Sequence, residues 1–386
     1  MALFRAPPQR YLLLAGAVVL FFVILHVGYK QESVHGFVHN LPSALTGSQQ
    51  QESSCQPGSL HPSKIPNIAH FVHLFPDDNE THQFRFSFRH FLAMYAVWLH
   101  WRPDAIYLHT DASPAAIEAA RNGKRGKWNR HIFNMPTLIV HSVKSPSKAG
   151  NGKIIEKIEH KSDFVRVEQV REMGGTYLDW DVMVLRDTRP LRESGFNAIV
   201  GHQPGGQVNS GIIMAKPHAR FATSWLAEAH HVFDGGWVTH SNDVADRLAR
   251  RMTRLPGAEV LIADQTAFSP GVTWQDVVVE LLAVHEDVKS NLEGWREGVD
   301  KLPEHEEAYD DRWKHPERFP EWDTDFSSSY MVHCFEIEKV IGTPVTPRLV
   351  LERKTSFGRM MYAVVKHMYE AGLVSLDDSH ESIPSD

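Results

Sequence analysis

The chain has 386 residues, of which 42% are hydrophobic and 10% aromatic, enough for a large core and against a mostly disordered or collagen-like protein. Lys and Arg number 40 against 47 Asp and Glu, so the formal net charge is −7 and no global basic footprint for duplex nucleic acid exists. Two cysteines exclude a disulfide framework or a cysteine-rich zinc module. The length allows two or three domains, or one large α/β unit.

The N-terminal segment 11–28 is a run of 18 residues with one polar side chain, His26. As a helix it would be about 27 Å long, just enough to cross the hydrocarbon core of a bilayer. Arg5 and Arg10 precede the run, and this positive bias predicts a cytoplasmic N-terminus. No A-x-A-like cleavage site follows it, which favours an uncleaved signal-anchor over a signal peptide.

We therefore expect a single-pass type II membrane protein. Its predicted parts are a cytosolic tail at 1–10, a transmembrane helix at 11–29, a flexible stem rich in Gln, Ser, Gly and Pro at 30–64, and a lumenal domain at 65–386. A sequon at Asn79 for an N-glycan agrees with this orientation. Cys55 and Cys334 are expected to be separate thiols, or Cys55 to bridge two chains, while an intramolecular disulfide stays open.

Strand and helix patterns alternate from residue 65 onward. In chain order they predict a strand at 68–75, a helix at 84–100, a strand at 105–109, a helix at 113–123, a strand at 137–143, a helix at 153–173, strands at 176–178, 198–201 and 211–215, a strand at 329–335 and a helix at 357–370. This alternation predicts an α/β fold with a mainly parallel sheet and helices on both faces. The charged stretch 286–325 has no clear period and is typical of an insertion or lid.

Asp179 and Asp181 follow a predicted strand, and ligands of such sheets bind beyond the carboxyl ends of strands. Two carboxylates at i and i+2 of an extended chain point to the same side. Oxygen ligands of this kind suit Mg²⁺ or Mn²⁺, which a nucleotide-sugar diphosphate needs. A second Asp-x-Asp, Asp323 and Asp325, lies in the charged stretch, and we expect it to be a solvated surface pair.

The segments Lys161-Ser162-Asp163-Phe164-Val165-Arg166 and Gly174-Gly175-Thr176-Tyr177-Leu178-Asp179-Trp180-Asp181 closely resemble the signature of glycosyltransferase family 32. That family includes fungal α-1,6-mannosyltransferases, mannosyltransferases of inositol phosphoceramide and α-1,4-galactosyltransferases of glycolipids. The resemblance is specific over about 153–190 and weaker over the rest of 65–340. It implies a GT-A fold, a divalent cation, usually Mn²⁺, transfer with retention of configuration, and a Golgi or endoplasmic reticulum membrane.

The resemblance also implies roles for individual residues. Asp179, Asp181 and His333 would hold the metal, with Asp179 and Asp181 also contacting the donor and Asn209 lying under the donor sugar or acceptor. The implied donor-binding residues are His70, Phe71, Val72, Asp163, Arg166, Gly175, Tyr177 and Asp179. The chain departs from the family at Trp180, where an aliphatic or small residue is usual, and at the first strand, which lacks a His-x-x-W pattern.

Each of these residues also has a purely structural interpretation. Asp163 and Arg166 at i and i+3 could be a surface helix pair, and His333 an ordinary partly buried histidine. The same holds for His70 on its apolar strand, and Asn209 could belong to a turn. The 24 histidines carry no zinc-binding spacing. If exposed in a mildly acidic lumen, about half would be charged and would offset the net charge.

Three classes of function remain. The leading one is a metal-dependent transferase that moves a hexose from a nucleotide sugar to a glycan or glycolipid. GDP-mannose and UDP-galactose are the first candidates for the donor, and UDP-glucose ranks after them. The second is an inactive lumenal glycan-binding protein on a transferase fold. The third, a glycoside hydrolase, needs two acids about 5–10 Å apart on opposite faces of the sugar bond, which neighbouring acids do not provide. The stretch 286–325 is our candidate for the acceptor side.

Overall fold

The structure is a computed structural model that describes residues 63–76, 83–271, 279–305, 312, 314–335 and 342–381. The predicted tail, membrane segment and nearly all of the stem lie outside these residues, as do Cys55 and Asn79. Within the described part, no helix combines the length and the apolar character needed to cross a membrane. Cys334 is buried and forms no disulfide with any described residue.

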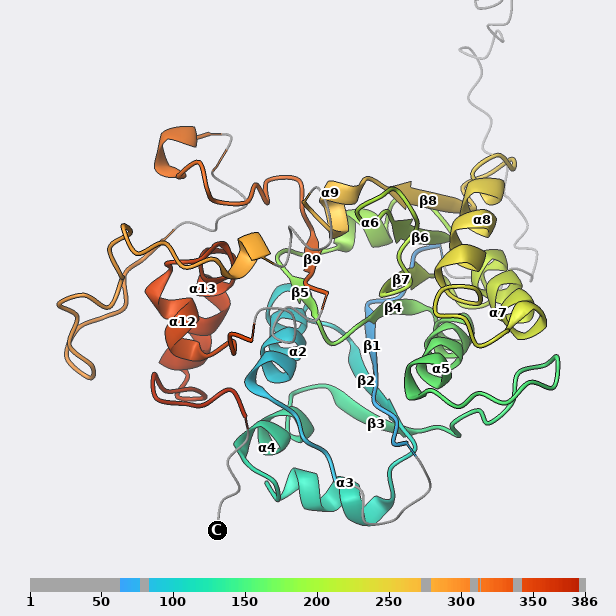
Figure 1. Ribbon diagram of the computed structural model, residues 1–386, viewed down its shortest axis with the longest axis horizontal. Coiled ribbons are helices and arrows are strands. Elements are labelled where there is room, and N and C mark those ends of the chain that lie inside the picture. Colours follow the sequence, from blue (N-terminus) through green and yellow to red (C-terminus); the bar gives the residue numbers. More distant parts are fainter. Residues whose placement is uncertain are drawn as a thin grey trace, which may run out of the picture. The chain divides into compact units, whose positions relative to one another are not determined.

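A seven-stranded sheet forms the centre of the domain (Figure 1). Its order is β3-β2-β1-β4-β7-β6-β8, and the strands are β1 (Ile68–Val72), β2 (Ala105–Thr110), β3 (Leu138–Ser142), β4 (Gly175–Leu178), β6 (Ala198–Gly201), β7 (Ile212–Ala215) and β8 (Val260–Ala263). Only β7 runs antiparallel to its neighbours. The predicted mainly parallel sheet is therefore confirmed, although β8 was not predicted.

Helices cover both faces of this sheet (Figure 1). One side carries α5 (Ile158–Met173), α7 (Arg220–Val232) and α8 (Asn242–Met252), and the other carries α2 (Phe88–Trp101), α4 (Lys127–Phe133), α12 (Pro347–Glu352) and α13 (Ser356–Glu370). Short helices α3 (Pro114–Arg121), α6 (Arg189–Arg192) and α9 (Gln265–Phe268) complete the described helices. The Ser113 side chain accepts a hydrogen bond from the Ala116 amide, as its N-cap position before Pro114 predicts.

Several helix and strand boundaries differ from the prediction, and two of them have a clear structural cause. Helix α5 begins at Ile158 rather than 153, because residues 149–153 form a loop tied to the end of α7 through the Asn151 amide, which donates to the Phe233 carbonyl at 2.8 Å. Strand β1 ends at Val72 rather than 75, beyond which the Phe75 amide is bound by the Asp111 side chain at 2.9 Å.

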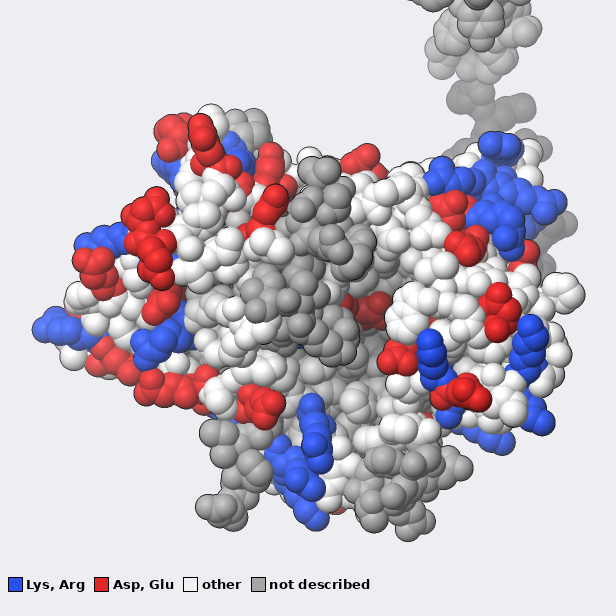
Figure 2. Space-filling model, viewed as in Figure 1, with Lys and Arg blue, Asp and Glu red and all other residues white. Residues whose placement is uncertain are grey.

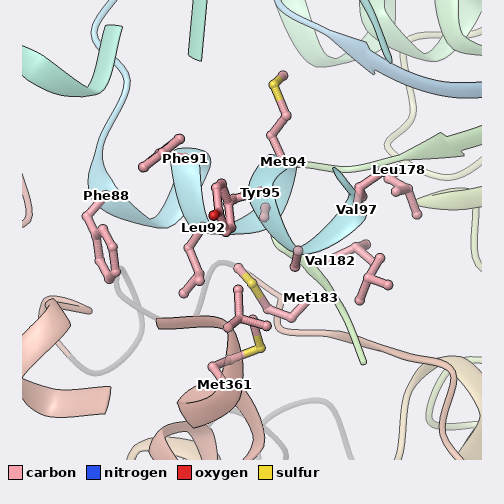
Figure 3. Packing of buried hydrophobic residues seen from close by; sticks show 14 of the residues in the cluster. Phe88, Phe91, Leu92, Met94, Tyr95, Val97, Leu178, Val182, Met183 and Met361 are labelled. Atoms are coloured by element: carbon pink, nitrogen blue, oxygen red, sulfur yellow. The ribbon is translucent and has the colours of Figure 1, made fainter. Parts of the chain in front are cut away.

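The larger hydrophobic core lies between the sheet and the side that carries α2 and α13. Figure 3 shows aromatic and aliphatic side chains of α2 next to Met183 of strand β5 (Val182–Val184) and Met361 of α13. Phe88 and Met361 are fully buried, and each such side chain contributes about 1.5–3 kcal/mol through burial. This core fixes β5, and therefore the start of the candidate site, against α2.

The charged stretch 286–325 is anchored to α13 wherever the structure describes it. The Lys366 ammonium pairs with Glu304, and the Tyr362 hydroxyl donates to the Pro303 carbonyl at 2.7 Å. The Arg359 guanidinium lies 2.7 Å from Asp323 Oδ2, and the Asp323 side chain is fully buried. The prediction of a solvated Asp-x-Asp surface pair is therefore wrong for Asp323, because a buried carboxylate with a cationic partner is a structural group.

Candidate functional site

The two acids of the Asp-x-Asp motif lie in a turn between β4 and β5. The Asp179 amide donates to the Gly211 carbonyl at 2.9 Å, and the Val182 amide donates to the Asp179 carbonyl at 3.1 Å. The sequence predicted an extended strand interrupted by acids, whereas the chain turns there and β5 leaves the main sheet. The turn still places both carboxylates at the carboxyl end of β4, the edge where such sheets bind ligands.

A second, two-stranded sheet brings His333 to these acids. Strand β9 (Met331–His333) pairs antiparallel with β5, so that Val182 lies opposite His333. The Cys334 amide donates to the Asp181 carbonyl at 2.8 Å, and His333 Nε2 lies 3.2 Å from Asp181 Oδ1. One ligand atom from each of Asp179, Asp181 and His333 lies within 4.8 Å of the others. Two carboxylates and one imidazole are a donor set that fits a divalent cation.

Arg166 of α5 contacts one of these acids, Asp179. Its guanidinium lies 3.2 Å from Asp179 Oδ1 and 3.1 Å from Asp163 Oδ1, and it donates to the Ser210 carbonyl at 3.1 Å. The Tyr177 hydroxyl also donates to Asp179. Arg166 is 7% exposed, so the alternative interpretation of Asp163 and Arg166 as a surface helix pair is wrong.

The electrostatics of the cluster show how strongly the acids attract positive charge. Burial raises the pKa of Asp179 above its ordinary value even though the Arg166 charge opposes the shift. Burial alone would lower the pKa of His333, yet attraction to Asp181 and then Asp179 leaves it raised. The two acids thus favour a positive charge at this position, beside the charge that Arg166 already supplies to Asp179. A bound metal ion would supply such a charge.

Asn209 and Gly211 form the floor next to Asp179. Asn209 Oδ1 accepts from the Gly211 amide and its Nδ2 donates to Gln203 Oε1, both at 2.6 Å. A Cβ atom on Gly211 would lie 2.6 Å from Asp179 Oδ2 and 2.8 Å from Asn209 Oδ1. Only glycine fits this approach, and Asn209 contacts Gly211 next to Asp179. Gly211 itself was not among the predicted site residues.

His70 lies in the sheet below the site and does not join the metal-binding cluster. Its Nε2 donates to the Gly174 carbonyl at 2.7 Å, and its Nδ1 contacts His109 Nε2 at 2.9 Å. His109 Nδ1 in turn lies 3.0 Å from His141 Nδ1. Gly175 has φ +100, and a Cβ there would lie 2.6 Å from the Ile68 carbonyl oxygen. In the structure these groups hold β1 against the start of β4.

Phe71 and Val72 meet the central residue of the motif rather than the acids. The Trp180 indole donates to the Val72 carbonyl at 2.8 Å, and its ring lies 4.7 Å from the ring of Phe71. Trp180 also packs against Phe86 at 4.9 Å and His90 at 5.3 Å. Trp180, which differs from the residue usual in the family, therefore packs into an aromatic cluster on the α2 side. This cluster fixes the turn that carries the acids.

The loop between α7 and α8 supplies residues that no sequence pattern indicated. His240 is buried, and its Nε2 lies 2.9 Å from Asp163 Oδ2. Asn242 accepts a hydrogen bond from the Ser210 amide at 3.1 Å through Oδ1. Both contacts are non-local and carry no local motif, so only the fold reveals them.

A cavity of about 560 Å³ lies elsewhere, beyond the end of β3. It is lined by residues 141–148 together with the α5 and α7 side chains Phe164, Glu168, Gln169, Leu226 and His230, and it includes none of the three candidate metal ligands. Figure 2 shows acidic side chains set back in a hollow near the middle of the face in view. This cavity is therefore separate from the candidate metal site.

The region of the chain that contains the two acids is similar to a known sequence family. Residues 92–202 match the family model described as glycosyltransferase sugar-binding region containing DXD motif. Glucan organizing enzyme 1 of Cryptococcus neoformans var. grubii is 26% identical over 231 residues, covering 55% of this chain and 57% of that protein. The chain thus matches just over half the length of this curated relative. These matches confirm the predicted resemblance to glycosyltransferase family 32.

Solved structures with some similarity are also glycosyltransferases. PaToxG glycosyltransferase has a TM-score of 0.37 at 14% identity, covering 50% of this chain and 71% of that chain. The galactosyltransferase LgtC, in complex with donor and acceptor sugar analogues, has a TM-score of 0.37 at 12% identity, covering 80% and 100%. GlyE of Streptococcus pneumoniae has a TM-score of 0.36 at 9% identity, covering 83% and 66%. At such TM-scores the assignment depends on the DXD region and on the site geometry.

Proposed function

We propose that this protein is a metal-dependent glycosyltransferase that moves a hexose from a nucleotide sugar to a glycan or glycolipid. The observation that carries the proposal is the cluster of Asp179, Asp181 and His333, whose two acids lie in the region that matches the DXD-motif family model. Asp179, Asp181 and His333 would hold a divalent cation, which we propose to be Mn²⁺. A cation held there would stabilise the negative charge that builds on the departing nucleoside diphosphate.

The surrounding residues support this chemistry by fixing the acids. Arg166 and the Tyr177 hydroxyl orient Asp179, while β9 fixes His333 beside Asp181. Gly211 leaves space above Asp179 that any side chain would fill. We propose GDP-mannose or UDP-galactose as the donor and retention of configuration, both of which come from the family resemblance. The proposed location is a Golgi or endoplasmic reticulum membrane, with residues 11–29 as the anchor and an N-glycan on Asn79.

The proposal is tested by measuring nucleotide release from GDP-mannose, UDP-galactose and UDP-glucose by the purified full chain. We expect release with Mn²⁺, none with excess EDTA, and a loss of at least about a hundredfold in the Asp181→Ala variant. Asp325→Ala is the matched control, because the Asp325 side chain is 59% exposed and is not part of the candidate metal-binding cluster.

The same assay separates the alternatives. Full activity of Asp181→Ala, or of the wild type in EDTA, would contradict the metal assignment. Glycan binding without any use of nucleotide sugars would favour the inactive lumenal binding protein. Cleavage of nitrophenyl glycosides without a nucleotide would favour a hydrolase.

A further inference from the structure

Trp237 is exposed in a way that no other described tryptophan is. It lies in the loop between α7 and α8, with 61% of its surface exposed, whereas the other described tryptophans are buried or half-buried. The Lys157 ammonium lies 5.5 Å from the centre of its ring. The ring of the buried His160, on α5, lies 5.7 Å from the Trp237 ring. The molecule thus presents an indole with an adjacent cation to solvent.

The loop that carries Trp237 is held in place by its own hydrogen bonds. Asp234 Oδ1 accepts from the Gly236 amide at 2.7 Å, and Ser241 Oγ donates to the Trp237 carbonyl at 3.3 Å. The buried Trp225 indole donates to the His240 carbonyl at 3.1 Å. An aromatic side chain on such an ordered loop loses little conformational freedom when it binds a ligand. The arrangement is therefore suited to recognition.

The same loop contacts the acidic site directly. The ring of His160 lies 4.8 Å from that of His240, whose Nε2 is 2.9 Å from Asp163 Oδ2. At the loop's end, Asn242 accepts from the Ser210 amide, next to Gly211 and Asp179. Two side chains in series, His160 and His240, therefore connect Trp237 to Asp163. The loop that carries Trp237 thus adjoins the candidate site.

We propose that Trp237 and Lys157 form a carbohydrate subsite that binds the acceptor glycan. This inference rests on the proposed transferase function. An indole offers an apolar face to the C–H side of a pyranose ring, while an ammonium donates hydrogen bonds to its hydroxyl groups. Trp237 and Lys157 lie outside the cluster that would hold the cation and the donor diphosphate. The subsite therefore acts on the acceptor and leaves donor use unchanged.

The test separates acceptor binding from donor use in the purified full chain. Saturation-transfer NMR with mannotriose and lactose measures glycan binding, and nucleotide release in Mn²⁺ without acceptor measures donor hydrolysis. We expect Trp237→Ala to weaken glycan binding about tenfold, as loss of an aromatic contact implies, and to leave hydrolysis within twofold. Trp237→Phe should retain most of the binding. Ile139→Ala, at a position 44% exposed and outside the stretch 286–325, is the matched control.

The Asp181→Asn variant distinguishes failure of this inference from failure of the proposed function. It should bind the glycans like the wild type while losing donor hydrolysis. Unchanged glycan binding by Trp237→Ala, or no saturation transfer from the wild-type protein to either glycan, would overturn the subsite. A Trp237→Ala variant that loses only its co-sedimentation with phosphatidylcholine vesicles would identify the indole as a lipid contact and would also overturn it.

Discussion

His333 Nε2 lies 3.2 Å from Asp181 Oδ1 because β9 pairs with β5 immediately beyond the acidic turn. The pairing sets Val182 opposite His333, and both residues are buried. The third candidate ligand is thus supplied by a strand that lies far from the two acids in the sequence. Its position depends on a strand register, which the apolar residues of β5 and β9 fix through the core.

We predict that His333→Gln weakens binding of Mn²⁺ by at least about tenfold, because it removes one of three ligands from a preformed set. Isothermal titration of the full chain with Mn²⁺ measures this directly. His231→Gln, at an exposed position of α7, should bind Mn²⁺ like the wild type. Equal affinity of wild type and His333→Gln would remove this histidine from the metal site.

Gly175 offers a test of the close approach between β4 and β1. Gly175→Ala should lower the free energy of unfolding by about 3 kcal/mol or more, because it combines a positive φ with a Cβ that would lie 2.6 Å from the Ile68 carbonyl oxygen. Gly372→Ala is the matched control, since Gly372 has φ +68 and nothing within 4 Å. It should cost only about 1–2 kcal/mol. Urea unfolding of both variants decides this, and equal losses would contradict the steric argument.

Asp323 and Arg359 provide a test of the anchored stretch 286–325. Asp323→Ala leaves the Arg359 guanidinium, only 11% exposed, without its carboxylate partner, and should cost about 3–5 kcal/mol. Asp325→Ala removes an acid that is 59% exposed and should cost less than about 1 kcal/mol. Thermal unfolding measures both. A loss for Asp323→Ala as small as that of Asp325→Ala would show that the stretch is not anchored there.

The sequence predicted the local parts of the site better than the non-local ones. The segment from α5 through Gly174 to Asp181 was predicted because helix, glycine stop, strand and acids follow one another along the chain. The role of His333 as a metal ligand was predicted only through the family resemblance. Gly211 and His240 were missed because their roles arise when distant segments approach one another, and no local periodicity records such an approach. The turn at Trp180 was predicted as an extended strand for the same reason.

Three buried histidines differ from the expectation that histidine side chains become charged in a mildly acidic lumen. Burial lowers the pKa of His70 and of His73 to about 4, and that of His109 to about 2. These side chains stay neutral in a mildly acidic compartment and cannot offset the net charge of −7. The expectation that about half of the exposed histidines would be charged therefore does not extend to these three buried rings. Buried neutral histidines instead make the fold sensitive to acid.

The final prediction concerns that sensitivity at His70. The unfolded chain binds a proton at this residue with a pKa near 6.5, whereas the folded protein does so only near 4. Between these values the unfolded state holds more protons, so stability is full above pH 6.5 and falls as the pH drops towards 4. His70→Gln keeps a donor for Gly174 but does not titrate, and should lose about 2 kcal/mol less between pH 7 and pH 5 than the wild type. Urea midpoints at both pH values measure the difference, with the exposed His231→Gln as control. Parallel pH profiles for wild type and His70→Gln would show that this histidine does not drive the acid response.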